Sequence, residues 1–261
     1  MRRTNEVQII HHDQALLVIS KPSGVSCGAD RNNAEELIDI LGRSGFPDAL
    51  PVHRLDKQTS GVMIVARHSD SQRQLTQMFY DRQVRKCYLA LVAGSPVDGS
   101  GTVDLPITGE WGHGQRMRVS RRKGKQAITH YRLIERFRGL SLLSCKPETG
   151  RTHQIRVHLA ALGCPLAVDP LYGSGRGIYL SDHKQGYRRS RDHIERPLIN
   201  RLTLHAHTIE LSHPQSGESM QWVAELPKDF RATLQQLCKY ACDSPHLQVD
   251  ALLSGQVLPQ I

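Results

Sequence analysis

The stretch PVHRLDKQTSGVMIVAR, residues 51–67, joins a polar loop to an apolar run and indicates both a buried strand and a candidate site. Its single carboxylate, Asp56, stands among three potential cations, which are His53, Arg54 and Lys57. A Thr-Ser-Gly turn leads into the apolar run 62–66, and a short continuous run of this kind is typical of a buried strand. A surface salt bridge would explain Asp56, and so would a reactive carboxylate held by guanidinium groups.

The other periodic segments predict an α+β fold with a largely antiparallel mixed sheet flanked by helices and loops. Strand patterns occur at residues 7–10, 16–20, 62–67, 86–93, 128–136, 140–146, 203–213 and 219–225. Helical spacing predicts a helix capped by Asn33, one capped by Ser69 and Asp70, one over 153–162 ended by Gly163, and one beginning at Pro227. Strands and helices do not alternate regularly, so a parallel sheet of βαβ units is not expected.

The chain is long enough for one large domain, which we place at residues 1–241 with its core at 7–240. The glycine-rich and charged segment 94–127 predicts loops and a hairpin, and residues 173–200 form an irregular basic insertion. Residues 242–261 are expected to be a loose tail.

The apolar runs argue against a membrane protein. The longest run near the start, residues 15–19, is too short to span a bilayer or to act as a secretion signal. We therefore expect a cytoplasmic protein with no membrane partner. The six cysteines show no CxxC spacing, which favours isolated, mostly buried thiols over a disulfide framework or a zinc site.

The charge pattern predicts a polyanionic partner. The formal net charge is +9 and the pI is about 9.4. Residues 111–139 carry nine Lys or Arg against one acid, and residues 184–201 carry six against two. Solvated surface charge is the alternative, but two one-signed segments in one domain favour contacts with phosphates.

Other chemistries find little support in the sequence. The fourteen histidines include His153 and His158, which a helix would place about 140° apart, so they do not share a metal-binding face. His205 and His207 share a strand face but have no third ligand nearby, and no HExxH motif occurs. The glycine-rich segment 173–177 lacks the P-loop spacing, and no GxSxG motif marks a nucleophilic serine. We expect no metal.

Several motifs resemble one known family. HRLDKQTSG at residues 53–61 resembles the signature of the RluA family of RNA pseudouridine synthases. The family's other motifs follow in order, as KPSG at 21–24, RKCY at 85–88, TGRTHQIR at 149–156, GCPL at 163–166 and DPLYG at 169–173. The resemblance implies that residues 1–241 form a pseudouridine synthase catalytic domain.

Two departures from the family pattern stand out. Many relatives carry an S4 RNA-binding module before the catalytic domain, and we expect none here, because the pattern starts near residue 7. Relatives often have Gly-Asp before the final Tyr-Gly, whereas this chain has Val168-Asp169, which we interpret as a feature of a subgroup.

The resemblance implies roles for individual residues. Asp56 would be the catalytic carboxylate, Arg156 its ion-pair partner, and Tyr88 an aromatic residue that stacks on the uracil and can exchange a proton. Arg54 would displace the target base from folded RNA, which must be flipped out to react. We expect further RNA contacts from His53, Lys57, Arg151, His153, Arg121, Arg122 and Lys123.

The predicted reaction breaks the C1′–N1 bond of uridine, rotates the base and joins C1′ to C5, so no redox step occurs and no cofactor is expected. The substrate would be ribosomal RNA of the large subunit or tRNA, and we expect a monomer with no obligate protein partner. The alternative is a non-catalytic RNA-binding protein on the same scaffold. The presence of Asp56, Tyr88 and Arg156 favours the enzyme.

Overall fold

A computed structural model of the chain describes residues 7–28, 36–109, 116–187, 194–242 and 247–256. The chain folds into two compact units. The first unit contains Met1–Tyr88 and His205–Glu225, and the second contains Leu89–Leu204 and Leu226–Ile261. Strands and helices are both present without regular alternation, which confirms the predicted α+β class.

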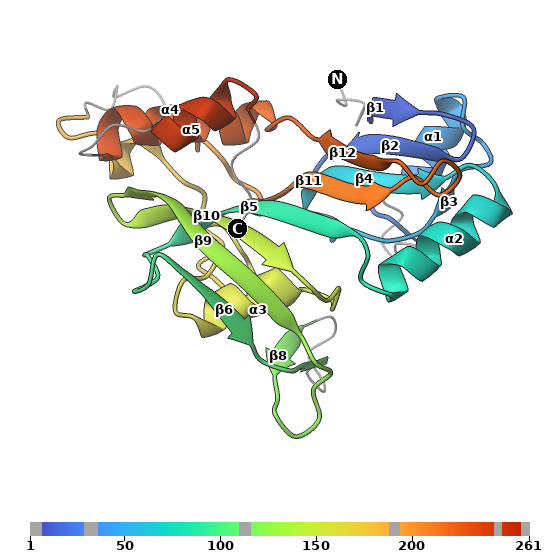
Figure 1. The fold of residues 1–261 in the computed structure, drawn as a ribbon. Coiled ribbons are helices and arrows are strands. Elements are labelled where there is room, and N and C mark those ends of the chain that lie inside the picture. Colours follow the sequence, from blue (N-terminus) through green and yellow to red (C-terminus); the bar gives the residue numbers. More distant parts are fainter. Residues whose placement is uncertain (1–6, 29–35, 110–115, 188–193, 243–246, 257–261) are drawn as a thin grey trace. The chain divides into compact units, whose positions relative to one another are not determined.

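The first unit is built on a sheet with the strand order β1-β2-β4-β11, to which β3 adds beside β4 and β12 beside β11 (Figure 1). These strands are β1 Gln8–His12, β2 Leu16–Lys21, β3 Leu50–Pro51, β4 Ser60–Ala66, β11 Leu204–Ser212 and β12 Ser219–Val223. The β4–β11 pair is parallel and the other pairs are antiparallel. The sheet is therefore mixed and largely antiparallel, as predicted.

Strand β4 lies at the centre of the core of the first unit. All seven of its residues are buried, because both of its faces are covered. Helices α1 (Leu37–Arg43) and α2 (Ser69–Tyr80) contribute Leu37 and Leu75 to this core. The continuous apolar run that follows the polar loop thus became the buried strand that the sequence indicates.

The N-termini of the two helices differ from the prediction. Asn33, the expected cap of the first helix, lies outside the described residues, and α1 begins at Leu37 after Glu36. The predicted caps of α2, Ser69 and Asp70, are wrong. His68 is the N-cap, and its imidazole Nδ1 accepts a hydrogen bond of 3.3 Å from the backbone N–H of Ser71.

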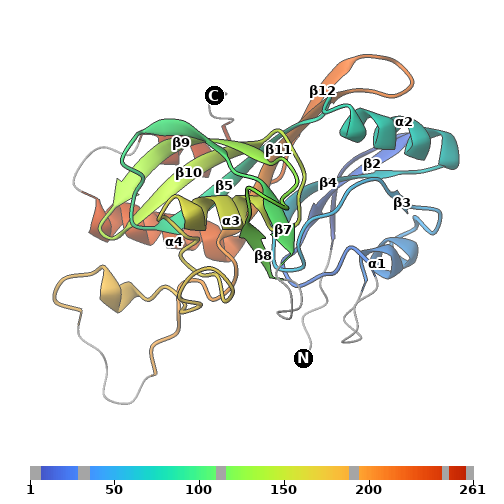
Figure 2. The same ribbon diagram turned by 90° about the horizontal axis from the view of Figure 1, so that it is seen from below.

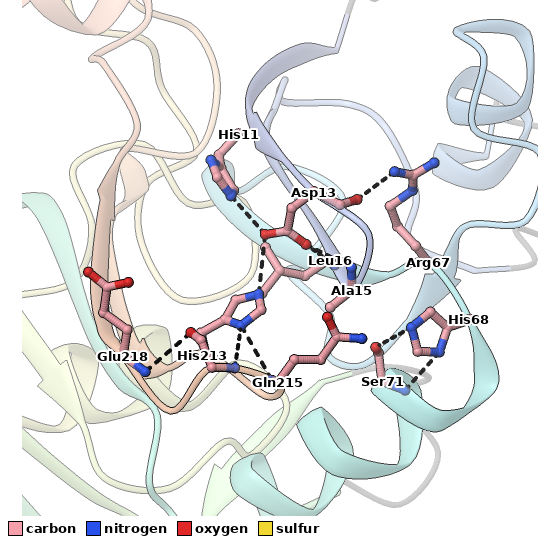
Figure 3. A network of polar contacts seen from close by, with 11 residues as sticks. His11, Asp13, Ala15, Leu16, Arg67, His68, Ser71, His213, Gln215 and Glu218 are labelled. Carbon is pink, nitrogen blue, oxygen red and sulfur yellow. Dashed lines mark hydrogen bonds and ion pairs between the residues drawn. The ribbon is translucent and has the colours of Figure 1, made fainter.

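A polar network fastens one edge of the first unit (Figure 3). The Asp13 carboxylate accepts hydrogen bonds from the backbone N–H groups of Ala15 and Leu16, at 2.7 and 2.9 Å. It also bonds His11 Nε2 at 2.9 Å and His213 Nε2 at 3.2 Å. One carboxylate therefore ties the turn between β1 and β2 to the turn between β11 and β12.

The second unit holds a sheet with the order β5-β10-β9-β6 and a separate ribbon, β7-β8. Its strands are β5 Arg85–Ala93, which starts in the first unit, β6 Ser100–Asp104, β7 Ile107–Gly109, β8 Met117–Val119, β9 Ile128–Phe137 and β10 Leu140–Pro147. The helix α3 (Gln154–Ala161) lies beside the ribbon (Figure 2). The loops and hairpin predicted for residues 94–127 are thus confirmed in type, with β6 as an additional strand.

The C-terminal segment corrects the predicted loose tail. Helix α4 (Lys228–Ala241) buries Phe230, Leu234 and Leu237 in the core of the second unit. Beyond it, α5 (Leu247–Leu253) adds Val249 and Leu252 to the same core. Residues 257–261 lie outside the described residues. The predicted helix start at Pro227 is one residue early, because Pro227 is the N-cap.

Within the described ranges, no helix has the length and apolar character needed to cross a membrane. The irregular character predicted for residues 173–200 is confirmed where the structure describes it. A 3₁₀ helix, η1 (Leu180–Asp182), and a single bridge between Ile178 and Ile199 are the regular features there. Residues 188–193, with three of the predicted cations, lie outside the described residues.

Candidate active site

The loop that carries Asp56 is fixed to the first unit by a fully buried lysine. The ammonium of Lys21 donates to three backbone carbonyls, those of Pro22, Val25 and Lys57, at 3.0, 2.9 and 3.1 Å. A fully buried charged side chain is rare, and here its three N–H donors all have acceptors. Lys21 therefore acts as an internal anchor, and its carbonyl acceptor on Lys57 lies one residue beyond Asp56.

Two further contacts bind the same segments together. The Ser23 hydroxyl donates to the backbone carbonyl of Gln58 at 2.7 Å, and the Gly24 N–H donates to that of Lys57 at 2.8 Å. The motif at residues 21–24 thus holds the main chain on the C-terminal side of Asp56. The backbone of the loop is positioned by hydrogen bonds from β2 and from the turn after it.

The Thr-Ser-Gly turn has a steric reason. Gly61 has φ +124°, and a Cβ at this position would lie 2.1 Å from the carbonyl oxygen of Ala206 on the adjacent strand β11. Only glycine permits this close approach of the parallel strands β4 and β11. Next to it, the Ser60 hydroxyl bonds His205 Nδ1 at 3.0 Å, and His205 Nε2 donates to the Ala224 carbonyl at 3.1 Å.

Tyr88 is electrostatically coupled to Asp56 within the first unit. Burial raises the pKa of the Tyr88 phenol, and the negative charge of Asp56 raises it further. The phenol is therefore neutral at physiological pH and can donate a hydrogen bond, but it is a poor base. The structure brings the predicted catalytic carboxylate and the predicted stacking residue into one neighbourhood.

His53 is a structural residue rather than the cation that the sequence allows. Its Nε2 accepts a hydrogen bond of 3.0 Å from the backbone N–H of Ile64, and its ring stacks on Phe79 with centroids 4.4 Å apart. Burial, together with the charge of Lys86, lowers the pKa of His53 to about 3. His53 is thus neutral, and any contact with RNA would come from an uncharged ring.

The other two residues of this loop differ in exposure. Arg54 is exposed, and within the described ranges it makes no hydrogen bond or ion pair. Lys57 is half-buried. The intervening Leu55 is buried in the core, which fixes the loop between them. The exposure of Arg54 fits a residue that contacts RNA, and this role stays a prediction.

In the second unit, Arg156 is buried and paired with Asp169. The guanidinium Nε and Nη2 donate to the two carboxylate oxygens at 2.8 and 2.9 Å. The Arg156 side chain is 7% exposed and that of Asp169 is 0% exposed. Asp169 also accepts hydrogen bonds from the backbone N–H groups of Leu171 and Tyr172. Asp169 therefore helps to orient Arg156.

The resemblance to the family also implies an ion pair between Arg156 and Asp56. These two residues belong to different units, so the pairing stays a prediction. The sequence places Asp169 in the last family motif but assigns it no function. The signal that would have revealed its role is a buried arginine, which requires an internal carboxylate.

The motif at residues 149–156 is locked onto strand β9. The Thr149 hydroxyl donates to Gln154 Oε1 at 2.7 Å, and Gln154 Nε2 donates to the Ile128 carbonyl at 2.9 Å. His158 follows one turn later, fully buried, with Nδ1 bonded to the Thr129 hydroxyl at 2.9 Å. These contacts fix the start of α3 and thereby the position from which Arg156 projects.

His153 has an internal role that the sequence does not reveal. It is the N-cap of α3, has the left-handed φ of 55°, and is 9% exposed. Its Nδ1 lies 2.9 Å from the hydroxyl of Tyr172, and the Tyr172 ring lies 5.0 Å from the Arg156 guanidinium carbon. The prediction that His153 contacts RNA thus rests on a nearly buried side chain.

The remaining predicted RNA-binding residues are exposed. Arg151 donates through Nε to the Gln126 carbonyl at 3.0 Å. The basic loop, defined here as Arg121, Arg122 and Lys123, lies in a tight turn closed by a hydrogen bond of 2.8 Å from the Gly124 N–H to the Ser120 carbonyl. No group of three or more His, Cys, Asp or Glu side chains in the described ranges is arranged to hold a metal ion.

Comparison with known proteins identifies the family to which this chain belongs. The family model of RNA pseudouridylate synthases matches residues 15–161, a span that contains Asp56, Tyr88 and Arg156. The chain belongs to the RNA pseudouridylate synthase family. Ribosomal large subunit pseudouridine synthase D of Xanthomonas campestris pv. campestris is 40% identical over 243 residues, covering 88% of this chain and 69% of that protein. The protein of the same name from Nitrosomonas europaea is 40% identical over 240 residues, covering 88% and 65%.

Solved structures of pseudouridylate synthases share the fold. Human RNA Pseudouridylate Synthase Domain Containing 1 has a TM-score of 0.70 at 25% identity, with both chains covered completely. Human RNA Pseudouridylate Synthase Domain Containing 4 has a TM-score of 0.67 at 27% identity, covering 88% of this chain and 93% of that one. The prediction of an RluA-type RNA pseudouridine synthase, an isomerase, is confirmed over the non-catalytic alternative.

Proposed function

We propose that this pseudouridylate synthase isomerises one or more uridines in large-subunit ribosomal RNA, with Asp56 as the reacting carboxylate. The names of the bacterial relatives support this choice of RNA over tRNA. The net charge of +9 supports a polyanionic substrate. We further propose that the enzyme acts in the cytoplasm as a monomer.

The single observation that carries the proposal is the anchored loop of Asp56 beside Tyr88. The main chain after Asp56 is held by Lys21, Ser23 and Gly24, and the charge of Asp56 acts on the Tyr88 phenol. A carboxylate held in this way can meet the ribose of a flipped nucleotide while the neutral aromatic ring stacks on the base. The base and the sugar thus meet different side chains of one unit.

The chemistry needs only these groups. The Asp56 carboxylate attacks C1′, or removes a ribose proton, as the C1′–N1 bond breaks and positive character develops on the sugar. The uracil leaves with the electron pair of the C1′–N1 bond and rotates, and its C5 then attacks C1′ while the Asp56–C1′ bond breaks or the ribose proton returns. C5 finally loses its proton to solvent and N1 takes up a proton from solvent, so that Asp56 is regenerated. In the proposal the positive charge of Arg156 stabilises the negative charge of Asp56.

The RNA would be held by cations that are exposed, apart from the half-buried Lys57. Arg54 is proposed to take the place of the flipped base, and Lys57, Arg151 and the basic loop to contact the backbone. Flipping a base costs a few kcal/mol. Contacts of cations with phosphates would offset this cost and make binding depend on salt.

Tritium release from a large-subunit rRNA transcript labelled with [5-³H]uridine tests the proposal. The wild-type protein should release tritium without added metal and in the presence of a chelator, whereas Asp56→Asn should release none. Asp48→Asn, which removes an exposed carboxylate from the same unit, is the matched control and should keep full activity. Substantial turnover by Asp56→Asn would exclude Asp56 as the reacting carboxylate.

Comparison of the pseudouridines in rRNA and tRNA with and without the gene would reveal the target. Pseudouridines that depend on the gene and occur only in tRNA would refute the choice of rRNA.

A further inference from the structure

Lys86 is a half-buried cation that has no anionic partner among the described residues. Among the residues that the structure describes, it makes no hydrogen bond or ion pair, and its ammonium lies 5.9 Å from the centroid of the Phe79 ring. Burial lowers the pKa of this lysine, and no carboxylate in the described part of the chain opposes that effect. A partly desolvated ammonium is costly unless an anion pairs with it.

The position of Lys86 relates it to the reacting residues. Lys86 and Tyr88 are two apart on β5, so their side chains point to the same face, about 7 Å apart. The charge of Lys86 acts on His53, and the charge of Asp56 acts on Tyr88. Lys86 therefore lies within electrostatic reach of His53, and Tyr88 within electrostatic reach of Asp56.

His53 supplies a second donor at this end. Its Nε2 accepts the Ile64 N–H, so the proton of the neutral ring is on Nδ1. Within the described ranges this Nδ1–H has no hydrogen-bond partner. The ring is held in place by its stack on Phe79, at an interplanar angle of 25°. The fixed neutral donor of His53 and the ammonium of Lys86 thus both lie near the Phe79 ring, and the charge of Lys86 acts on His53.

We propose that Lys86 binds a phosphodiester that flanks the target uridine, with the Nδ1–H of His53 as a second donor. The proposal rests on the proposed function, because it places the flipped base and ribose at Tyr88 and Asp56. A bound phosphate would supply the anion that Lys86 lacks, and charge-assisted bonds to phosphate are among the strongest in proteins. Lys86 is then a substrate-positioning residue that acts through the RNA backbone and does not read a base.

The competing explanation is that Lys86 only packs on Phe79. Three variants separate the two. Lys86→Gln removes the charge, Lys86→Met removes it but keeps the apolar contact with Phe79, and Lys86→Arg keeps the charge. Arg85→Gln is the matched control, because Arg85 lies on the opposite face of β5 with its side chain 73% exposed and pairs with Glu210 at 3.1 Å.

The measurement is filter binding of the large-subunit rRNA transcript as a function of salt. Loss of one phosphate contact should weaken binding about tenfold and reduce the slope of log K against log[salt] by about 0.7–0.9 in Lys86→Gln and Lys86→Met. Lys86→Arg and Arg85→Gln should keep the wild-type slope. The thermal midpoint of Lys86→Met should not fall, because an unpaired, partly buried charge has been removed.

Tritium release completes the test. Both neutral variants should raise KM about tenfold and change kcat little, since the contact is made in the ground state as well as in the transition state. A wild-type salt slope in Lys86→Gln and Lys86→Met would overturn the inference, and so would an equal loss of slope in Arg85→Gln. Absence of tritium release by the wild-type enzyme would refute the proposed function. The salt slopes would still test whether Lys86 binds a phosphate of the RNA.

Discussion

Asp169→Asn should be among the most damaging conservative changes in this enzyme. Asp169 is completely buried and receives two hydrogen bonds from Arg156, at 2.8 and 2.9 Å, and two more from the backbone. Asparagine keeps the shape of the side chain but carries no charge, and its amide NH₂ would face a guanidinium that only donates. Arg156 would then lose the carboxylate that accepts its Nε and Nη2 hydrogen bonds.

The size of the effect follows from the burial of both partners. Removing one member of a buried ion pair costs about 3–5 kcal/mol, because the remaining charge is uncompensated. A domain of this kind is stable by about 5–15 kcal/mol, so the variant should fold but unfold at a much lower urea concentration. Tritium release measured where the variant is still folded should fall as well, since Asp169 orients Arg156.

The second unit contains its own control. Arg176 and Asp182 form a pair of the same type, with two nitrogen–oxygen distances of 2.6 and 3.0 Å, but the side chains are 60% and 34% exposed. Exposed pairs contribute at most about 1 kcal/mol, so Asp182→Asn should change stability little and activity not at all. Equal losses of unfolding free energy in the two variants would refute the argument that burial of the Arg156 pair makes Asp169 indispensable.

Two further predictions concern the first unit. Gly61→Ala should lower the unfolding free energy in urea by about 2–6 kcal/mol, because its Cβ would lie 2.1 Å from the Ala206 carbonyl at φ +124°. Gly45→Ala, at φ +92° with open space, should cost only the backbone strain of about 1–3 kcal/mol, and equal costs would contradict the steric argument. Burial raises the pKa of Asp13, but hydrogen bonds outweigh it, first that from the Leu16 N–H, and lower the pKa from 3.8 to about 2. The ionised carboxylate therefore stabilises the fold fully above pH 3.8, and this stabilisation is lost as the pH falls through 2. Asp13→Asn should lower the unfolding free energy by about 1–2 kcal/mol at pH 7, after allowance for the partial exposure of Asp13. In urea titrations the difference in unfolding free energy from wild type should shrink between pH 4 and 2, and a difference that stays constant would argue against this linkage.

Local patterns predicted the elements of this fold well, for a physical reason. Period-two alternation and short continuous apolar runs bounded by turns are typical of strands, and the strands around Leu16, Val62, Lys86 and Leu140 formed as expected. Gly163 ends α3 with φ 81°, the left-handed conformation that a glycine after a helix favours. Each of these features depends on residues that are close in the sequence.

Features that depend on distant residues were not predicted. The parallel pairing of β4 with β11 brings Gly61 against Ala206, and no local pattern indicates which strands become neighbours. Helix α5 forms where a loose tail is expected because Val249 and Leu252 find an apolar core formed by other segments. A short helix of this kind is stable through tertiary packing rather than through its own propensity.

The charge states of the side chains near Asp56 could not be predicted from local sequence either. They also indicate which cations are available to bind the substrate. From the sequence, His53, Arg54 and Lys57 all stand as potential cations around Asp56, but neighbours in space decide their charge. His53 is neutral because it is buried beside Lys86. Lys21 is bound by backbone carbonyls and Arg156 by Asp169, so both of these buried cations have partners inside the protein. In a nucleic-acid enzyme the cations that lack such partners are the ones whose free energy improves when a phosphate arrives. A basic composition therefore predicts the class of partner, whereas only the burial and pairing of each cation in the folded chain indicate where that partner binds.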